Sequence, residues 1–193
     1  QTKRAKQDLT RVSASYEDDG YYKSGFDVAR RLGDNNEFGV RVSSSYGQGE
    51  HIVEGMDDTN ATGVVALDYT TDKLKLNFDA YAVRDKRDNG SPVMVSMGTI
   101  GKVIDAPSGD SNFFPNIHGE QNSQYVGASG EYKFSPDLKV FAGAGYNEKE
   151  YAGHIFGTRM IVTNAATGAA SSQYYRVGYQ EHAVAANLGL EGK

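Results

Sequence analysis

The sequence has no cysteine and no tryptophan among its 193 residues, and only four prolines. Without cysteine the chain can form no disulfide, no thiolate metal site and no cysteine nucleophile. This absence argues weakly against a disulfide-stapled secreted module, but it assigns no compartment.

Long apolar runs and a surplus of positive charge are also missing. No stretch of about 18 apolar residues could form a transmembrane helix, and residues 1–10 lack the apolar region of a signal peptide. The sequence begins without methionine, so we expect it to be a piece of a longer chain. Its net charge of −5 argues against a nucleic-acid partner, because phosphate binding needs a concentrated basic face.

Glycine and aromatic residues are abundant instead. The 23 glycines, 13 tyrosines and 8 phenylalanines favour aromatic-rich strands joined by many turns. The hydrophobic share of 38% and the mean hydropathy of −0.57 are low for a chain of this length. Either much of the chain is loop or only one face of each element is apolar, and we predict an all-β fold.

Alternation of apolar and polar residues, the pattern of a half-buried strand, recurs along the sequence. It is clearest where Leu74, Leu76 and Phe78 alternate with Lys75 and Asn77. Eight strands are predicted, at residues 9–17, 25–32, 38–46, 61–69, 74–83, 125–134, 138–146 and 182–190.

Tight and long connections alternate between these strands. Tight turns are predicted near residues 33–36, 70–73 and 135–137, and long loops near 47–60, 84–123 and 147–180. In an antiparallel meander, all the tight turns then lie at one end and all the long loops at the other. This is the pattern of an outer-membrane β-barrel, whose apolar face meets lipid and whose polar face lines a wet interior.

Aromatic residues stand near the ends of several predicted strands, as in the aromatic girdles at membrane boundaries. Ordinary packing of aromatic rings across strands is the alternative. The residues concerned are Tyr16, Phe38, Tyr69, Tyr132, Phe134 and Tyr146.

Several segments resemble TonB-dependent siderophore receptors, especially those for ferrichrome-like hydroxamates. They are TKRA at residues 2–5, RRLGDNNEFGVRVSSSYGQGE at 30–50 and ALDYTTDKLKLNFDAYAVRDKRDNG at 66–90. Within the second segment the resemblance rests on Arg31, Gly33, Asn35 and Arg41, and Leu67 to Tyr69 carry it in the third. APSGDSNFFP at 106–115 is similar to an extracellular loop of these receptors.

The resemblance implies the N-terminal part of a barrel of about 22 strands, without the plug domain that fills such barrels. Residues 1–8 would be the end of the plug and the linker, and residues 9–193 a segment of the transmembrane β-barrel. The implied function is to bind a ferric siderophore and import it by TonB-dependent transport, with no intrinsic cofactor. Its partners would be the siderophore, the TonB complex acting through the plug, and outer-membrane lipid with lipopolysaccharide.

Aromatic and histidine residues of the last two long loops are the candidate ligand-binding residues, because an organic metal chelate gains from aromatic contact area. Packing of the loops on themselves is the alternative. The candidates are Phe113, Phe114, His118, Tyr151, His154, Phe156, Tyr174, Tyr175 and Tyr179.

No pattern in the sequence supports enzyme chemistry. The four histidines are scattered without zinc-ligand spacing, and no nucleophile elbow, phosphate loop or dinucleotide fingerprint is present. One alternative function is a self-sufficient eight-stranded outer-membrane barrel that acts as an adhesin or structural protein. A soluble lipocalin-like binder is another, and it requires the face with Lys75, Asn77 and Asp79 to point outward.

Overall fold

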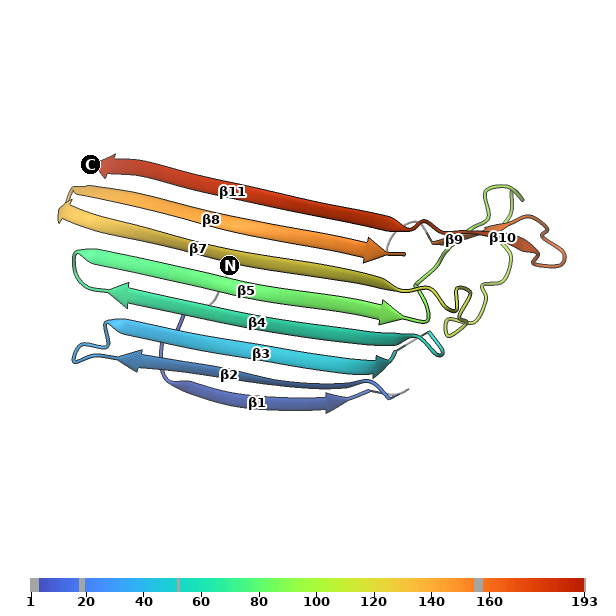
Figure 1. The fold of residues 1–193 in the computed structure, drawn as a ribbon, viewed down its shortest axis with the longest axis horizontal. Helices are drawn as coiled ribbons and strands as arrows, with labels where there is room; N and C mark the ends of the chain where they lie inside the picture. The colour runs from blue at the N-terminus through green and yellow to red at the C-terminus, as the bar shows by residue number, and fades with distance from the viewer. Residues whose placement is uncertain (1–3, 18–19, 52, 155–157, 193) are drawn as a thin grey trace.

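The computed structural model describes residues 4–17, 20–51, 53–154 and 158–192. The long strands are β1 (Leu9–Tyr16), β2 (Tyr22–Leu32), β3 (Phe38–Glu50), β4 (Asp57–Thr70), β5 (Leu74–Asp88), β7 (Gly119–Ser135), β8 (Leu138–Gly153) and β11 (Val177–Gly192). The short strands are β6 (Met94–Ser96), β9 (Arg159–Val162) and β10 (Ala170–Gln173). The long strands form one eight-stranded antiparallel sheet in chain order, which confirms the predicted all-β meander (Figure 1).

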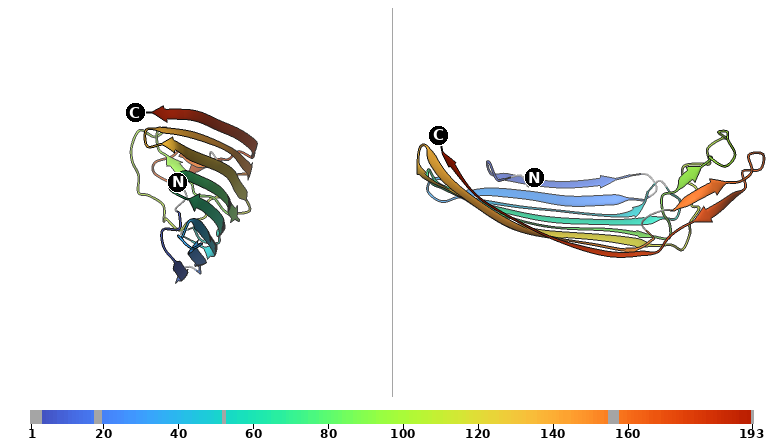
Figure 2. Two further views of the ribbon diagram at one scale, coloured as in Figure 1. Left: turned by 90° about the vertical axis from the view of Figure 1, so that its left-hand side faces the viewer. Right: turned by 90° about the horizontal axis from the view of Figure 1, so that it is seen from above.

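The large sheet is open and curved. Its end view shows the strands as an arc, with the N-terminal segment on the hollow side (Figure 2). Among the described residues, β1 pairs only with β2 and β11 only with β8, so both are edge strands. A closed eight-stranded barrel would require β1 to pair with β11, and the structure therefore does not support the alternative of a self-sufficient small barrel.

The ladders extend farther toward the loop end than the alternation of residues predicted. β3 continues to Glu50, β4 already begins at Asp57, and β5 continues to Asp88, so the connecting segments shorten to 51–56, 89–118 and 154–176. Arg84 and Lys86 show the reason, since they occupy the face that is apolar lower down β5. Backbone pairing continues there after the apolar pattern has ended.

Register divides the sheet into an apolar and a polar face, because residues directly paired across strands point to the same side. Leu67 pairs with Phe78, and one position further Asp68 pairs with Asn77. The polar side is the hollow one, since it receives the N-terminal segment through an ion pair between Arg4 and Asp79. The convex side carries the apolar residues, from Leu74 to Ala82 on β5, about the 9–11 residues that a tilted strand needs to cross a bilayer.

The aromatic residues predicted as girdles lie on the convex face, and all but Tyr146, which is in register with Val126 and Ala80, are near an end of their strands. Phe38 pairs with Tyr69 near the tight turns, whereas Tyr16 pairs with Tyr22 at the loop end. Tyr16 is 73% exposed, as expected of a ring that contacts solvent or lipid rather than a protein core. Two levels of outward aromatic rings match the arrangement of membrane-boundary girdles, which stay a prediction.

Glycines on the concave face make room for an aromatic ring that lies flat on the sheet. A Cβ atom at Gly127 would come within 2.1 Å of the Tyr125 hydroxyl, and one at Gly145 within 3.0 Å. The Tyr125 ring stacks on Tyr81, with 5.3 Å between the ring centroids. Because the ring lies over glycines, the Tyr125 side chain stays close to the backbone of the sheet and projects little into the concave side.

A positive charge on the convex face should be far more damaging than the same charge on the concave face. We expect Ala80→Arg, in the middle of the apolar band, to cost about 2–4 kcal/mol of unfolding free energy in lipid. Ala185→Arg, at a similar depth on the concave face, is the matched control and should cost much less. Urea unfolding in lipid vesicles measures both, and equal costs would contradict the assignment of the lipid-facing side.

Candidate functional site

The loop end of the sheet gathers most of the predicted ligand-binding residues. Segments 51–56, 89–118 and 154–176 emerge there, and the latter two contain the small sheet (Figure 1). In that sheet β9 pairs in parallel with β6 and antiparallel with β10, so the two longest loops form one structure. Side-chain contacts add to this, because the Ser91 and Thr158 hydroxyls lie 3.0 Å apart and are buried.

Two asparagines tie the base of these loops together. Asn89, in the left-handed conformation with φ of 56°, donates from Nδ2 to the Gly55 carbonyl at 2.8 Å and accepts at Oδ1 from the Asn116 amide at 2.9 Å. Asn112 Nδ2 donates to the carbonyls of Asn89 at 2.7 Å and Glu54 at 3.0 Å. Asparagine tolerates the left-handed backbone conformation, and its side-chain amide can form the hydrogen bonds that a backbone turn would otherwise make. Both properties explain why asparagine stands at position 89.

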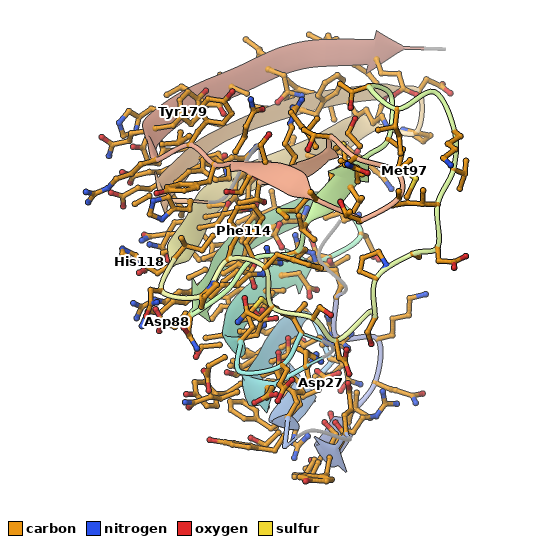
Figure 3. The ribbon with its side chains drawn as sticks, turned by 90° about the vertical axis from the view of Figure 1, so that its right-hand side faces the viewer. Asp27, Asp88, Met97, Phe114, His118 and Tyr179 are labelled. Carbon is orange, nitrogen blue, oxygen red and sulfur yellow. The ribbon has the colours of Figure 1, made fainter. Side chains whose placement is uncertain are left out.

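Four of the predicted residues form one cluster, which we call the aromatic cluster: Phe114, His118, His154 and Tyr174. The His154 ring makes edge contacts with His118 at 5.7 Å and Tyr174 at 5.4 Å, and Phe114 meets Tyr174 at 6.2 Å. Phe114 is buried, whereas Tyr174 is more than half exposed. Figure 3 looks onto this end and places Phe114 near its middle, with His118 to one side.

The other predicted residues lie elsewhere. Tyr151 and Tyr179 face each other across β8 and β11 with ring centroids 5.8 Å apart, below the aromatic cluster on the concave wall. Tyr175 is 55% exposed, and Phe113 lines a separate cavity in the small sheet. Phe156 lies outside the described residues.

A polar cavity of about 160 Å³ opens on the concave wall beside His154. Asp58 contributes a carboxylate that lies 3.2 Å from the Arg87 guanidinium, and Asp85 and Gln121 are among the other residues that line the cavity. These residues were missed in the sequence because they lie on strand ends where polar residues occupy both faces. The register in which β4, β5 and β7 pair brings these residues together.

Tyr21 and His51 form a second aromatic pair at the loop end, near β1. Their rings stack with centroids 3.8 Å apart, and His51 Nδ1 lies 3.5 Å from a Glu17 carboxylate oxygen. Burial raises the pKa of the Tyr21 phenol, and the neighbouring carboxylates of Asp58 and Glu17 raise it further. The phenol therefore stays neutral at physiological pH.

At the opposite end, two ion pairs fix the N-terminal segment against the concave wall. Arg4 pairs with Asp79 and donates to the Leu67 carbonyl at 2.9 Å. Arg31 donates to Asp68 at 2.5 Å and to the Ala5 carbonyl at 3.1 Å.

Gly39 lies directly beneath the second of these pairs. A Cβ atom there would come within 2.2 Å of both Arg31 Nη1 and Asp68 Oδ2, so any larger residue at this position would displace the ion pair. Arg31 is also one of the residues that carry the resemblance to siderophore receptors, and its contacts with Asp68 and Ala5 give it a structural role.

Within the described part of the chain, no three or more histidine, aspartate or glutamate side chains gather closely enough to hold a metal ion. None of the described segments is a helix long and apolar enough to cross a membrane.

The curved sheet, with its apolar convex face, polar concave face and long loops at one end, has the architecture of a segment of an outer-membrane β-barrel. No model of a protein family matches the sequence. The ferrichrome receptor FcuA of Yersinia enterocolitica is 25% identical over 186 residues, which are 95% of this chain and 24% of the receptor. The chain thus spans about a quarter of the length of this relative.

Solved structures agree with this relationship. BauA, the ferric preacinetobactin receptor from Acinetobacter baumannii, superposes with a TM-score of 0.85 at 27% identity over 99% of this chain and 28% of that one. The pyoverdine receptor FpvA from Pseudomonas aeruginosa, at 14% identity, shares the fold with a TM-score of 0.79 over 98% of this chain and 28% of its own.

These matches confirm the resemblance read from the sequence. The chain corresponds to part of the barrel of TonB-dependent siderophore receptors, which reside in the outer membrane of Gram-negative bacteria and are not enzymes. The predicted fold, a segment of a larger transmembrane barrel, is confirmed with it.

The Arg31–Asp68 pair should contribute strongly to stability, because Asp68 is only 7% exposed. We expect Arg31→Ala to cost about 3 kcal/mol or more, since it leaves a buried charge unpaired, and Arg31→Ala with Asp68→Asn to recover part of the loss. Arg30→Ala, at the next residue on the opposite face, should cost about 1 kcal/mol. Urea unfolding of the lipid-reconstituted protein compares the three, and similar losses for both single changes would refute the prediction.

Asn89 should hold two loops in place at once. Asn89→Ala removes two hydrogen bonds and places alanine in the left-handed region, so we expect amide exchange to accelerate about tenfold or more in segments 51–56 and 112–118. Asn164→Ala is the control, because the side-chain hydrogen bonds of Asn164 to described residues stay within its own turn, at the amides of Ala166 and Thr167. Hydrogen exchange followed by mass spectrometry measures both, and unchanged exchange in 51–56 would show that Asn89 does not link the loops.

Proposed function

We propose that this segment belongs to an outer-membrane receptor that binds a ferric siderophore at its loop end and imports it by TonB-dependent transport. The aromatic cluster at the mouth of a curved, polar wall is the observation that carries the proposal. A ferric chelate with an organic shell gains contact area from such rings, while hydroxyl and imidazole groups reach its oxygen atoms. FcuA, BauA and FpvA are described as receptors for ferrichrome, ferric preacinetobactin and pyoverdine, which supports this ligand class.

Two carboxylates on the concave wall are evidence for a plug domain inside the barrel, which TonB-dependent transport requires. Asp68 Oδ2 and Asp79 Oδ1 are buried without a hydrogen-bond partner among the described residues, although each carboxylate has an arginine on its other oxygen. A buried acceptor without a donor is costly, which is expected if a further segment supplies that donor inside the barrel. The N-terminal segment, held by Arg4 and Arg31, enters the wall beside these two carboxylates.

The faces of the sheet assign the remaining partners. Outer-membrane lipid and lipopolysaccharide would surround the convex face, whose apolar band ends in the charged positions Arg84, Lys86 and Asp88. Arg84 pairs with Glu120 at 2.8 Å on this polar rim. The residues of the aromatic cluster, together with Tyr151, Tyr175 and Tyr179, would meet the siderophore.

Removing one ring from the aromatic cluster tests ligand binding. We expect Tyr174→Ala to weaken binding of ferric hydroxamates by about tenfold, because it removes contact area from both Phe114 and His154. Tyr132→Ala, at the turn end of the convex face, is the matched control and should bind normally. Quenching of intrinsic fluorescence on titration with ferrichrome gives the affinities.

Unchanged affinity in Tyr174→Ala would assign these rings to loop packing rather than to ligand. Absence of binding in the unmodified protein, with every ferric siderophore tested, would overturn the proposed function itself.

A further inference from the structure

The small sheet has one face made almost entirely of apolar side chains. Parallel pairing places Val95 of β6 opposite Met160 of β9, and antiparallel pairing places Val162 opposite Ala170 of β10. Since side chains alternate along a strand, all four point to the same side, and Arg159, Ile161 and Ser171 point to the other. Residues from both long loops therefore contribute to a single apolar surface.

The segment after β6 crosses this face without filling it. Ile104, Pro107 and Phe113 come from that segment, and together with the sheet residues and Met97 they line a partly open cavity of about 250 Å³. Figure 3 shows Met97 in this region, on the opposite side of the loop end from His118. We call this space the loop cavity.

The lining of the loop cavity offers few hydrogen-bond partners to water. An ordered water needs about two to four polar partners. Among the described residues that line the cavity, Asp105 is the one that carries a charge, and it is exposed. Apolar lining of this kind favours an apolar guest, since a buried apolar cavity of about 150 Å³ already accommodates benzene.

Consecutive residues connect the loop cavity to the aromatic cluster. Phe113 lines the cavity, and the next residue, Phe114, belongs to the cluster, whose member His118 lies on the far side of the loop end from Met97 (Figure 3). Because consecutive Cα atoms are about 3.8 Å apart, the backbone of this dipeptide joins the edge of the cavity to the edge of the cluster. A chelate bound over the cluster would then present any apolar substituent toward Phe113.

We propose that the loop cavity binds an apolar group of the transported chelate, an aromatic ring or a short acyl chain, while its iron-binding part lies over the aromatic cluster. This inference rests on the proposed receptor function. It makes the small sheet a specificity element that selects chelates by their apolar substituent. Met97 and Met160, which are flexible and polarisable, would adapt the cavity to groups of different shape.

Methionine methyl groups offer a direct test with benzene as the probe. In complete protein carrying ¹³C-methyl methionine, in lipid nanodiscs, we expect benzene to shift the methyl signals of Met97 and Met160. Met56, buried away from the loop cavity, and Met94, which is 66% exposed, are internal controls and should not shift. Single Met→Leu substitutions assign the four signals. Unshifted Met97 and Met160 signals, or an equal shift of Met94, would overturn the proposal.

Substitutions on two adjacent residues of β10 separate the cavity from the rest of the loops. Ala170→Leu fills the cavity and should abolish the benzene shifts, whereas Ser171→Leu, on the other face, should retain them. Unmodified protein should bind ferric octanohydroxamate about tenfold or more tightly than ferric acetohydroxamate, because the chain adds apolar contact area. Ala170→Leu should remove that preference and Ser171→Leu should keep it.

Equal affinity of the unmodified protein for the two ferric complexes would overturn the cavity proposal while leaving the receptor function intact. Failure to bind either complex or ferrichrome would overturn the receptor function as well, even if benzene still shifted the two methyl signals.

Discussion

Because side chains alternate between two faces along every strand, a shift of one residue in any ladder would exchange the lipid-facing and lumen-facing sets of that strand. The eight strands are paired in continuous register from Leu9 to Gly192, with one irregularity between Lys133 and Ser135. This constraint determines which residues reach the concave wall. The Arg31–Asp68 pair, the polar cavity beside Asp58 and the flat ring of Tyr125 all depend on it, since each joins residues from different strands.

Most of the large sheet could be predicted from sequence, since its apolar band imposes strict alternation. Leu74 to Ala82 is the clearest case, and the turns after Leu32, Thr70 and Ser135 lie where glycine, asparagine, threonine or proline interrupt the pattern. Prediction failed where that constraint ends. At the loop end of β3, β4 and β5, residues on both faces meet water, so pairing continues without a hydrophobic signal.

The loops were less predictable, because their structure depends on contacts distant in sequence. Three-residue β6 pairs with β9 some 65 positions away, and no local pattern of that length identifies a strand. Aromatic content alone identified Phe114, His118, His154 and Tyr174, which the fold brings together, but it could not separate them from Phe113 or Tyr175. Asn89 and Asn112 went unnoticed because asparagine is common in any polar loop, and only their partners show what they hold.

The contacts of Arg4 also have a mechanical consequence. Its guanidinium reaches past β1, β2 and β3 to bind β4 and β5 in the interior of the sheet. A pulling force applied to the start of the chain would therefore be shared with interior strands, which have hydrogen-bonded neighbours on both sides. The load would then not fall on β1 alone, although β1 follows Arg4 in the chain.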